Sequence, residues 1–168
     1  MQSLRPSADG ISLHEGVGPR YRCQLHLNRF REIHMVTLEE ISQLLYGAGE
    51  EVAGWQDTQE DLISLAAKSF PGKAFCVVTQ WILIDLTVTP DEKEKLTNLG
   101  LLPMTLFAHE IVLDSKGRFQ PAMWVRSNFG KSFTQGCMFE TKSTVYLLLG
   151  TGQRKEATVG AAFSMTVG

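Results

Sequence analysis

The stretch KAFCVVTQWILIDLTV, residues 73–88, decides the fold class of this chain. β-branched and aromatic side chains crowd it, and a helix would restrict too many of them, so the stretch favours β-structure. We expect two consecutive strands in the centre of a sheet, because the apolar run is nearly continuous. Asp85 is the exception: on strand alternation it shares a face with Trp81 and Leu83, so its carboxylate should lie at a strand end in water or be paired.

Three helices are predicted around this run from their capping residues. TLEEISQLLYGAG has Thr37 as the N-cap and Glu40 as the partner that completes a capping box. TQEDLISLAAKSF follows Thr58 or Asp57 and carries acids in its first turn, as the helix dipole prefers. TPDEKEKLTNLG, with Thr89 as cap and Pro next to it, predicts a short helix from about residue 90 to 99.

The second half of the chain reads mainly as strands. MTLFAHEIVLD, the turn SKG and RFQPAMWVRS predict an antiparallel hairpin. NFGKSFTQG, residues 128–136, reads as a loop, and further strands are expected near 137–141, 143–149 and 157–165. Helices gathered early and strands gathered late indicate an α+β fold, built on a mostly antiparallel sheet with two or three short helices mainly in the N-terminal half.

The first 34 residues differ in charge from the rest. They hold five arginines against three acids, a formal +2, which leaves −4 for the remainder. RYRCQLHLNRF, residues 20–30, fits an alternating strand or a loosely docked arm. We therefore expect residues 1–34 to be an N-terminal extension or arm and residues 35–168 to be a single α+β domain. A start codon assigned too far upstream would look the same.

Removal of residues 1–34 tests this division. The shortened chain is expected to stay soluble and to unfold cooperatively, because the strong helix and strand signals all begin after Met35. Thermal unfolding followed by circular dichroism measures this. Loss of a cooperative transition would instead place RYRCQLHLNRF in the core.

Composition excludes few functions. With 168 residues, 43% of them hydrophobic and 20% charged, the chain is typical of one globular domain, and its net charge of −2 gives no argument for nucleic acid. No signal peptide or membrane span is recognised, so a cytoplasmic protein without a membrane partner is expected. The three cysteines lack CxxC spacing, and neither metal nor cofactor is expected. Cys76 reads as a small buried hydrophobe, and Cys137, in a predicted loop, is the thiol to test for reactivity.

The stretch FAHEIVLDSKGRF, residues 107–119, contains the strongest candidates for chemistry. A hydrolase or nuclease would use His109 as general base or metal ligand, with Glu110, Asp114 or Asp85 as carboxylate and Arg118 or Arg126 holding an anion. In a strand, however, His109 and Glu110 point to opposite faces. One histidine with a few acids is also a common combination, so the hairpin interpretation is preferred.

The turn in this stretch has a structural interpretation. Asp114, Ser115, Lys116 and Gly117 fit a type I turn, in which Gly takes the left-handed conformation. Asp114 and Arg118 should then face each other across the hairpin as a surface ion pair worth at most about 1 kcal/mol.

Two further sets of residues have both a functional and a structural interpretation. The candidates for binding a single strand of nucleic acid are Arg118, Trp124, Arg126 and Lys131, which combine charge with an aromatic ring. The faces of an ordinary hairpin give the same pattern. GAGE at 47–50 and GTGQRK at 150–155 lack the residues of a phosphate-binding loop and read as turns.

The order of four segments resembles a family of small bacterial proteins of unknown function, sometimes found in prophage regions. The segments are GKAFC, WILIDL, LFAHEIVLDSKGRFQPAMWVRS and MFETKSTVYLLLGTGQRK. The resemblance covers about residues 35–168. Related sequences tend to carry Pro-Gly-Asp before the tryptophan where this chain has Pro121-Ala122-Met123, so any role of an acid there is missing. The resemblance implies no activity, cofactor or catalytic residue.

These observations favour a noncatalytic module that binds another macromolecule, most simply a protein. An accessory factor of a phage or prophage is one form of it. The alternatives are the hydrolase or nuclease built on His109 and the binder of single-stranded nucleic acid.

Overall fold

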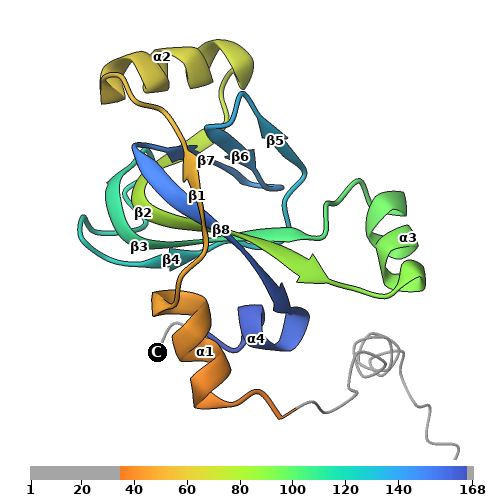
Figure 1. Cartoon of the computed structure of the whole chain (residues 1–168). Coiled ribbons are helices and arrows are strands. Elements are labelled where there is room, and N and C mark those ends of the chain that lie inside the picture. The colour runs from red at the N-terminus through yellow and green to blue at the C-terminus, as the bar shows by residue number, and fades with distance from the viewer. Residues whose placement is uncertain (1–34, 166–168) are drawn as a thin grey trace, which may run out of the picture. The chain divides into compact units, whose positions relative to one another are not determined.

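The computed structural model describes residues 35–165, and the expected arm at residues 1–34 lies outside them. Four helices and eight strands follow one another in the described part (Figure 1). The helices are α1 (Leu38–Tyr46), α2 (Gln59–Ser69), α3 (Pro90–Asn98) and α4 (Val159–Phe163). The strands are β1 (Glu50–Ala53), β2 (Ala74–Thr87), β3 (Met104–Asp114), β4 (Val125–Arg126), β5 (Ser132–Thr134), β6 (Met138–Glu140), β7 (Thr144–Leu148) and β8 (Thr151–Thr158).

The three helices predicted from their caps are confirmed. Thr37, Thr58 and Thr89 each lie just before a helix and accept a hydrogen bond from the backbone N–H three residues later. The capping box predicted with Glu40 is present in α1, and a second capping box, with Glu92, begins α3. These signals are local, and a side chain that satisfies a free N–H of the first turn acts independently of the rest of the fold.

The prediction of two consecutive strands over residues 73–88 is wrong, because this stretch forms the single long strand β2. Gln80 has a φ of 49° within it, a left-handed conformation that is uncommon for a residue with a side chain. Cys76 and Val78 face the same core cluster as Trp81 and Leu83, so the alternation shifts by one residue near Gln80. The residues that face this cluster are therefore even-numbered before Gln80 and odd-numbered after it, while the chain continues in the same direction.

The sheet is mixed, which corrects the expectation of a mostly antiparallel sheet. Its main path runs β1-β8-β2-β7-β6-β5, and β3 pairs with both β2 and β4. β2 is antiparallel to β3, but it is parallel to β7 through Val78 and parallel to β8 from Ile82 onward. Both parallel partners come from the C-terminal part of the chain, and their direction depends on long connections that no local signal reveals.

Three details of the C-terminal half also differ from expectation. The expected loop at 128–136 contains the strand β5, which pairs with β6. The expected strand at 157–165 is wrong, because β8 ends at Thr158, which caps the short helix α4. Residues 151–155 of GTGQRK lie in β8 and are not a turn. The strands expected near 137–141 and 143–149 are confirmed as β6 and β7.

The core forms on both faces of the curled sheet. One cluster, which includes Trp81, Leu83 and Phe139, fills the inside of the curl. A second lies between the sheet and the pair α1 and α4, and a third lies beneath α2, at the opposite end of the sheet in Figure 1. Within residues 35–165, every buried polar side-chain atom has a hydrogen-bond partner. The hairpin of β3 and β4 is present, but β4 has only two residues.

Candidate functional site

His109 and Glu110 have different partners, so they do not act as a pair. The Nε2 atom of His109 lies 3.1 Å from the carbonyl oxygen of Leu45, and its ring contacts Tyr46 and Phe107. Since a carbonyl only accepts, Nε2 carries the proton in neutral His109, and Nδ1 keeps its lone pair.

Glu110 is bonded to the facing strand instead. Its Oε2 atom accepts from Thr79 Oγ1 and Gln80 Nε2, each at 3.1 Å.

The other two catalytic candidates are engaged elsewhere. Asp85 receives two hydrogen bonds from Arg154 on β8, at 2.6 and 2.9 Å. Arg126 donates to the carbonyl oxygens of Met165 and Ser127 and lies over the Phe163 ring at 4.5 Å. Burial lowers the pKa of Arg126 from its ordinary value. In residues 35–165, no three His, Cys, Asp or Glu side chains gather as a metal site would require.

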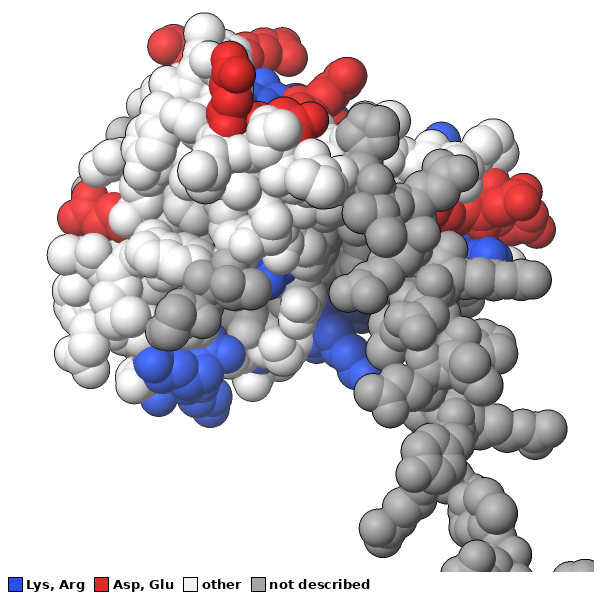
Figure 2. All heavy atoms as spheres, turned by 90° about the horizontal axis from the view of Figure 1, so that it is seen from below, with Lys and Arg blue, Asp and Glu red and all other residues white. Residues whose placement is uncertain are grey.

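The proposed nucleic-acid contacts are also used within the protein. Lys131 lies 3.7 Å from Glu140, which is also paired with Lys73. The Trp124 ring is stacked on Phe107, with centroids 5.7 Å apart. On the face drawn in Figure 2, the Lys and Arg side chains of the described residues lie in separate groups and form no continuous band. Arg118, the remaining candidate, is paired with Asp114.

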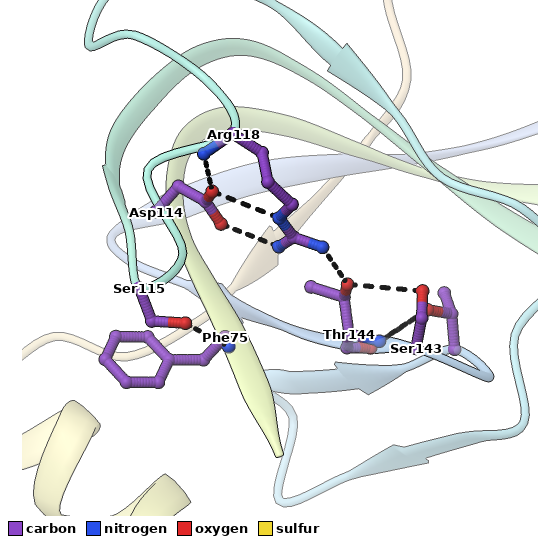
Figure 3. A network of polar contacts seen from close by, with 7 residues as sticks. Phe75, Asp114, Ser115, Arg118, Ser143 and Thr144 are labelled. Atoms are coloured by element: carbon purple, nitrogen blue, oxygen red, sulfur yellow. Dashed lines mark hydrogen bonds and ion pairs between the residues drawn. The ribbon is translucent and has the colours of Figure 1, made fainter.

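The Asp114–Arg118 pair is a buried anchor, which corrects the expectation of a surface ion pair. The Asp114 side chain is fully buried, whereas that of Arg118 is 35% exposed. Arg118 contacts the carboxylate through its backbone N–H, Nε and Nη2, and its Nη1 donates to Thr144 Oγ1 of β7 at 2.9 Å (Figure 3). The turn is as predicted: Gly117 has a φ of 63° and donates to the Asp114 carbonyl.

Electrostatics in this network follow from burial and from the guanidinium. Burial raises the pKa of Asp114, but the hydrogen bonds and charge of Arg118 outweigh it and leave the pKa below its ordinary value. Burial, helped by the charge of Asp114, raises the pKa of the Cys76 thiol to about 12. Cys76 is therefore the buried hydrophobe that the sequence indicated, and it is not a nucleophile.

Cys137, the thiol that the sequence indicated for a test of reactivity, is buried. It is only 2% exposed and belongs to the cluster beneath α2. Burial raises its pKa, which disfavours the reactive thiolate. The expected loop is present, because Cys137 lies in the turn between β5 and β6, but its side chain is buried there.

Lys155 is a buried cation that the sequence did not single out. It lies beside a groove of about 500 Å³ between α1, β8 and α4. Its Nζ atom donates to the carbonyls of Leu44 at 2.9 Å and Gly47 at 2.6 Å, with Gln43 at 3.5 Å. Burial lowers its pKa, while these carbonyls at the negative end of α1 favour the ammonium. Lys155 thus fixes α1 to β8 and is not free for a ligand.

A second cleft, of about 270 Å³, gathers polar groups that have few internal partners. It is lined by Leu45, Tyr46, Gly47, Gln80, Trp81, Ile82, His109 and Gln153, and we call it the His109 cleft. The pairs Thr79↔Glu110 and Trp81↔Ala108 place Gln80 opposite His109. Of these residues the sequence pointed to His109 alone. A polar glutamine inside an apolar strand was the signal that could have indicated Gln80.

Exposed apolar side chains gather on α1. Of the large hydrophobic residues described, six are markedly exposed, and three of them lie in or next to this helix: Met35 at 81%, Leu38 at 86% and Tyr46 at 75%. The others are Leu99, Leu113 and Met123. Acidic residues Glu39, Glu50 and Glu51 are exposed nearby in the sequence.

No helix among residues 35–165 has the length and apolar character that crossing a membrane requires. No curated protein and no solved structure matches this chain. A family model described as a domain of unknown function, DUF6957, matches residues 51–164, so the predicted resemblance to an uncharacterised family is confirmed over that range, which begins after α1. With this match over more than half of its length, the chain belongs to the DUF6957 family, a domain of unknown function.

Proposed function

We propose that this protein is a noncatalytic module that binds another polypeptide through the outer side of α1. The observation that carries the proposal is the exposure of Met35, Leu38 and Tyr46 within twelve residues of chain. Large apolar side chains that are scattered singly need no explanation, but a group of them is typical of an interaction surface. We call these three residues the α1 surface.

The hydrogen bonds of the residues that were candidates for catalysis support a binding function over a catalytic one. Asp85, Glu110 and Arg126 are each bonded to other residues of the protein. A hydrolase would need His109 and a carboxylate within reach of one substrate atom. The nucleic-acid alternative would need free cations, whereas Arg118 and Lys131 have acidic partners.

The charge near the α1 surface indicates the chemistry of the partner. Glu39 lies beside Leu38, and Glu50 and Glu51 follow shortly after α1, all exposed. Residues 35–168 together carry a formal −4. A second copy would bring like charges together, so the favoured partner is a different polypeptide with an apolar contact bordered by Lys or Arg. That the module is an accessory factor of a phage or prophage stays a prediction.

Site-specific photo-cross-linking tests the proposal. A photoreactive residue at position 38 is expected to give one discrete adduct with a second polypeptide, which mass spectrometry identifies. The purified partner should then bind Leu38→Ser about tenfold more weakly than wild type, the loss of about 1.4 kcal/mol expected for a central contact. Leu99→Ser is the matched control, because Leu99 is also exposed, at 72%, but lies after α3.

Three results would contradict the proposal. The first is an adduct within the same chain or between two copies of it. The second is equal labelling from positions 38 and 99. The third is equal weakening of partner binding by Leu38→Ser and Leu99→Ser, which would show that the contact is not specific to α1.

A further inference from the structure

We propose that the His109 cleft binds a neutral nucleobase, as a free base or a nucleoside. This inference concerns a cleft that shares Tyr46 with the α1 surface but includes neither Met35 nor Leu38, and it goes beyond the proposed protein binding. It rests on the polar groups of the cleft, on the absence of charged side chains from its described lining, and on the conformation of Gln80.

The lining residues keep unused hydrogen-bonding capacity. Within the described residues, the Gln153 amide and the Tyr46 hydroxyl make no side-chain hydrogen bond, although Gln153 is half-buried. Gln80 uses Nε2 for Glu110, which leaves its carbonyl oxygen free, and His109 keeps the Nδ1 lone pair. The cleft therefore offers amide donors and acceptors, one imidazole acceptor and one hydroxyl.

The backbone at Gln80 is a second, independent observation. The φ of 49° lies inside a strand, where such a conformation costs about 1 kcal/mol or more for a residue with a side chain. Glycine would adopt it without strain. Retaining glutamine there is explained if the amide oxygen that the bond to Glu110 leaves free contributes a function that glycine cannot supply. Strain of this kind gathers at ligand sites.

The lining also indicates the class of ligand. None of the lining residues of the cleft is Asp, Glu, Lys or Arg, so the lining has no carboxylate for an ammonium and no lysine or arginine for a phosphate. The Tyr46 ring, 75% exposed, lies 5.5 Å from the His109 ring at a tilt of 33°, and together they form an aromatic wall. Glutamine amides pair with two adjacent atoms of a base edge, and aromatic rings stack on the face of a base. A volume of about 270 Å³ accommodates one base, and the ribose of a nucleoside would extend out of the cleft.

Titration of the full-length protein with adenosine, guanosine, cytidine and uridine tests this inference, with binding followed by protein-observed NMR. At least one nucleoside is expected to shift the signals of Gln153 and His109. The Gln153→Ala variant should bind it about fivefold to tenfold more weakly, as expected for loss of one or two hydrogen bonds. Gln120→Ala is the matched control, because Gln120 is exposed and lies outside the cleft.

Two further measurements separate a role of these residues in ligand binding from a purely structural role. Gln80→Gly relieves the positive φ, so it should unfold at the same or a higher temperature and yet bind the nucleoside more weakly. The matching 5′-monophosphate should bind no more tightly than the nucleoside. Unchanged affinity in both Gln80→Gly and Gln153→Ala would overturn the proposal, as would tighter binding of the monophosphate or the absence of any signal change at the cleft. Leu38→Ser should not alter nucleoside binding, so failure here is distinguishable from failure of the α1 surface.

Discussion

Replacement of Arg118 by methionine is expected to lower the free energy of unfolding by about 3 to 5 kcal/mol, because it leaves a buried carboxylate without its cation. The Asp114 side chain is fully buried, and Arg118 supplies three of the hydrogen bonds that it receives. The backbone N–H of residue 118 would remain after the substitution, but the charge of the guanidinium would not. Urea unfolding at neutral pH measures the loss.

The partner substitution provides a control with a predicted asymmetry. Asp114→Asn should cost less than Arg118→Met, because Arg118 is 35% exposed and its cation can be hydrated by solvent. Lys131→Met removes a cation that is 44% exposed and 3.7 Å from Glu140, and it should cost less than about 1 kcal/mol. Equal losses for Arg118→Met and Lys131→Met would show that Asp114 is solvated and that the buried network is not an anchor.

The pH dependence of this pair has a definite sign. The folded-state pKa of Asp114 lies below its ordinary value of 3.8. At pH values between these two pKa values, the folded state therefore holds fewer protons than the unfolded state. The stability contributed by the pair is therefore fully present above that value and is lost as the pH falls through the folded-state pKa. The difference in stability between wild type and Arg118→Met should accordingly be largest at neutral pH and should shrink in acid.

Local features of the fold were predictable, and long-range ones were not. Thr37, Thr58 and Thr89 marked helix starts correctly because a cap is satisfied by the backbone of the next three residues. The burial of Asp114 was missed because it depends on β7, whose Thr144 is bonded to Arg118 twenty-six residues away. The parallel pairing of β2 with β7 and β8 was missed for the same reason.

The candidate site was predictable only in part. Strand alternation correctly indicated that His109 and Glu110 would not form an acid–base pair, and the partners of the two residues agree with it. The same rule did not reveal Gln80 and Gln153 near His109, because alternation assumes a regular strand and the phase of β2 shifts at Gln80. A single residue in a left-handed conformation thus decided which side chains meet at the cleft.

Gly152→Ala is expected to destabilise the protein by about 3 kcal/mol, because the added methyl group has no space. A Cβ atom at position 152 would lie 2.2 Å from Cδ2 of Trp81. The indole is only 1% exposed and its Nε1 donates to the Leu149 carbonyl, so it cannot move away without breaking the core. The second glycine of GTG, Gly152, is therefore explained by the packing of Trp81 from β2 against β8. A phosphate-binding role is not needed to explain it.

The sign of this effect separates a clash from a change in backbone preference. Alanine is more favourable than glycine in the interior of a strand by about 0.5 to 1 kcal/mol, so without a clash the substitution would stabilise the protein. In a Trp81→Leu background the ring is gone, and the cost of Gly152→Ala should fall by about 1 to 3 kcal/mol in a double-mutant cycle. Thr151→Ala, at the exposed neighbouring position, should change stability by less than about 0.5 kcal/mol. Additive effects of Trp81→Leu and Gly152→Ala in chemical unfolding would show that the indole does not lie against Gly152.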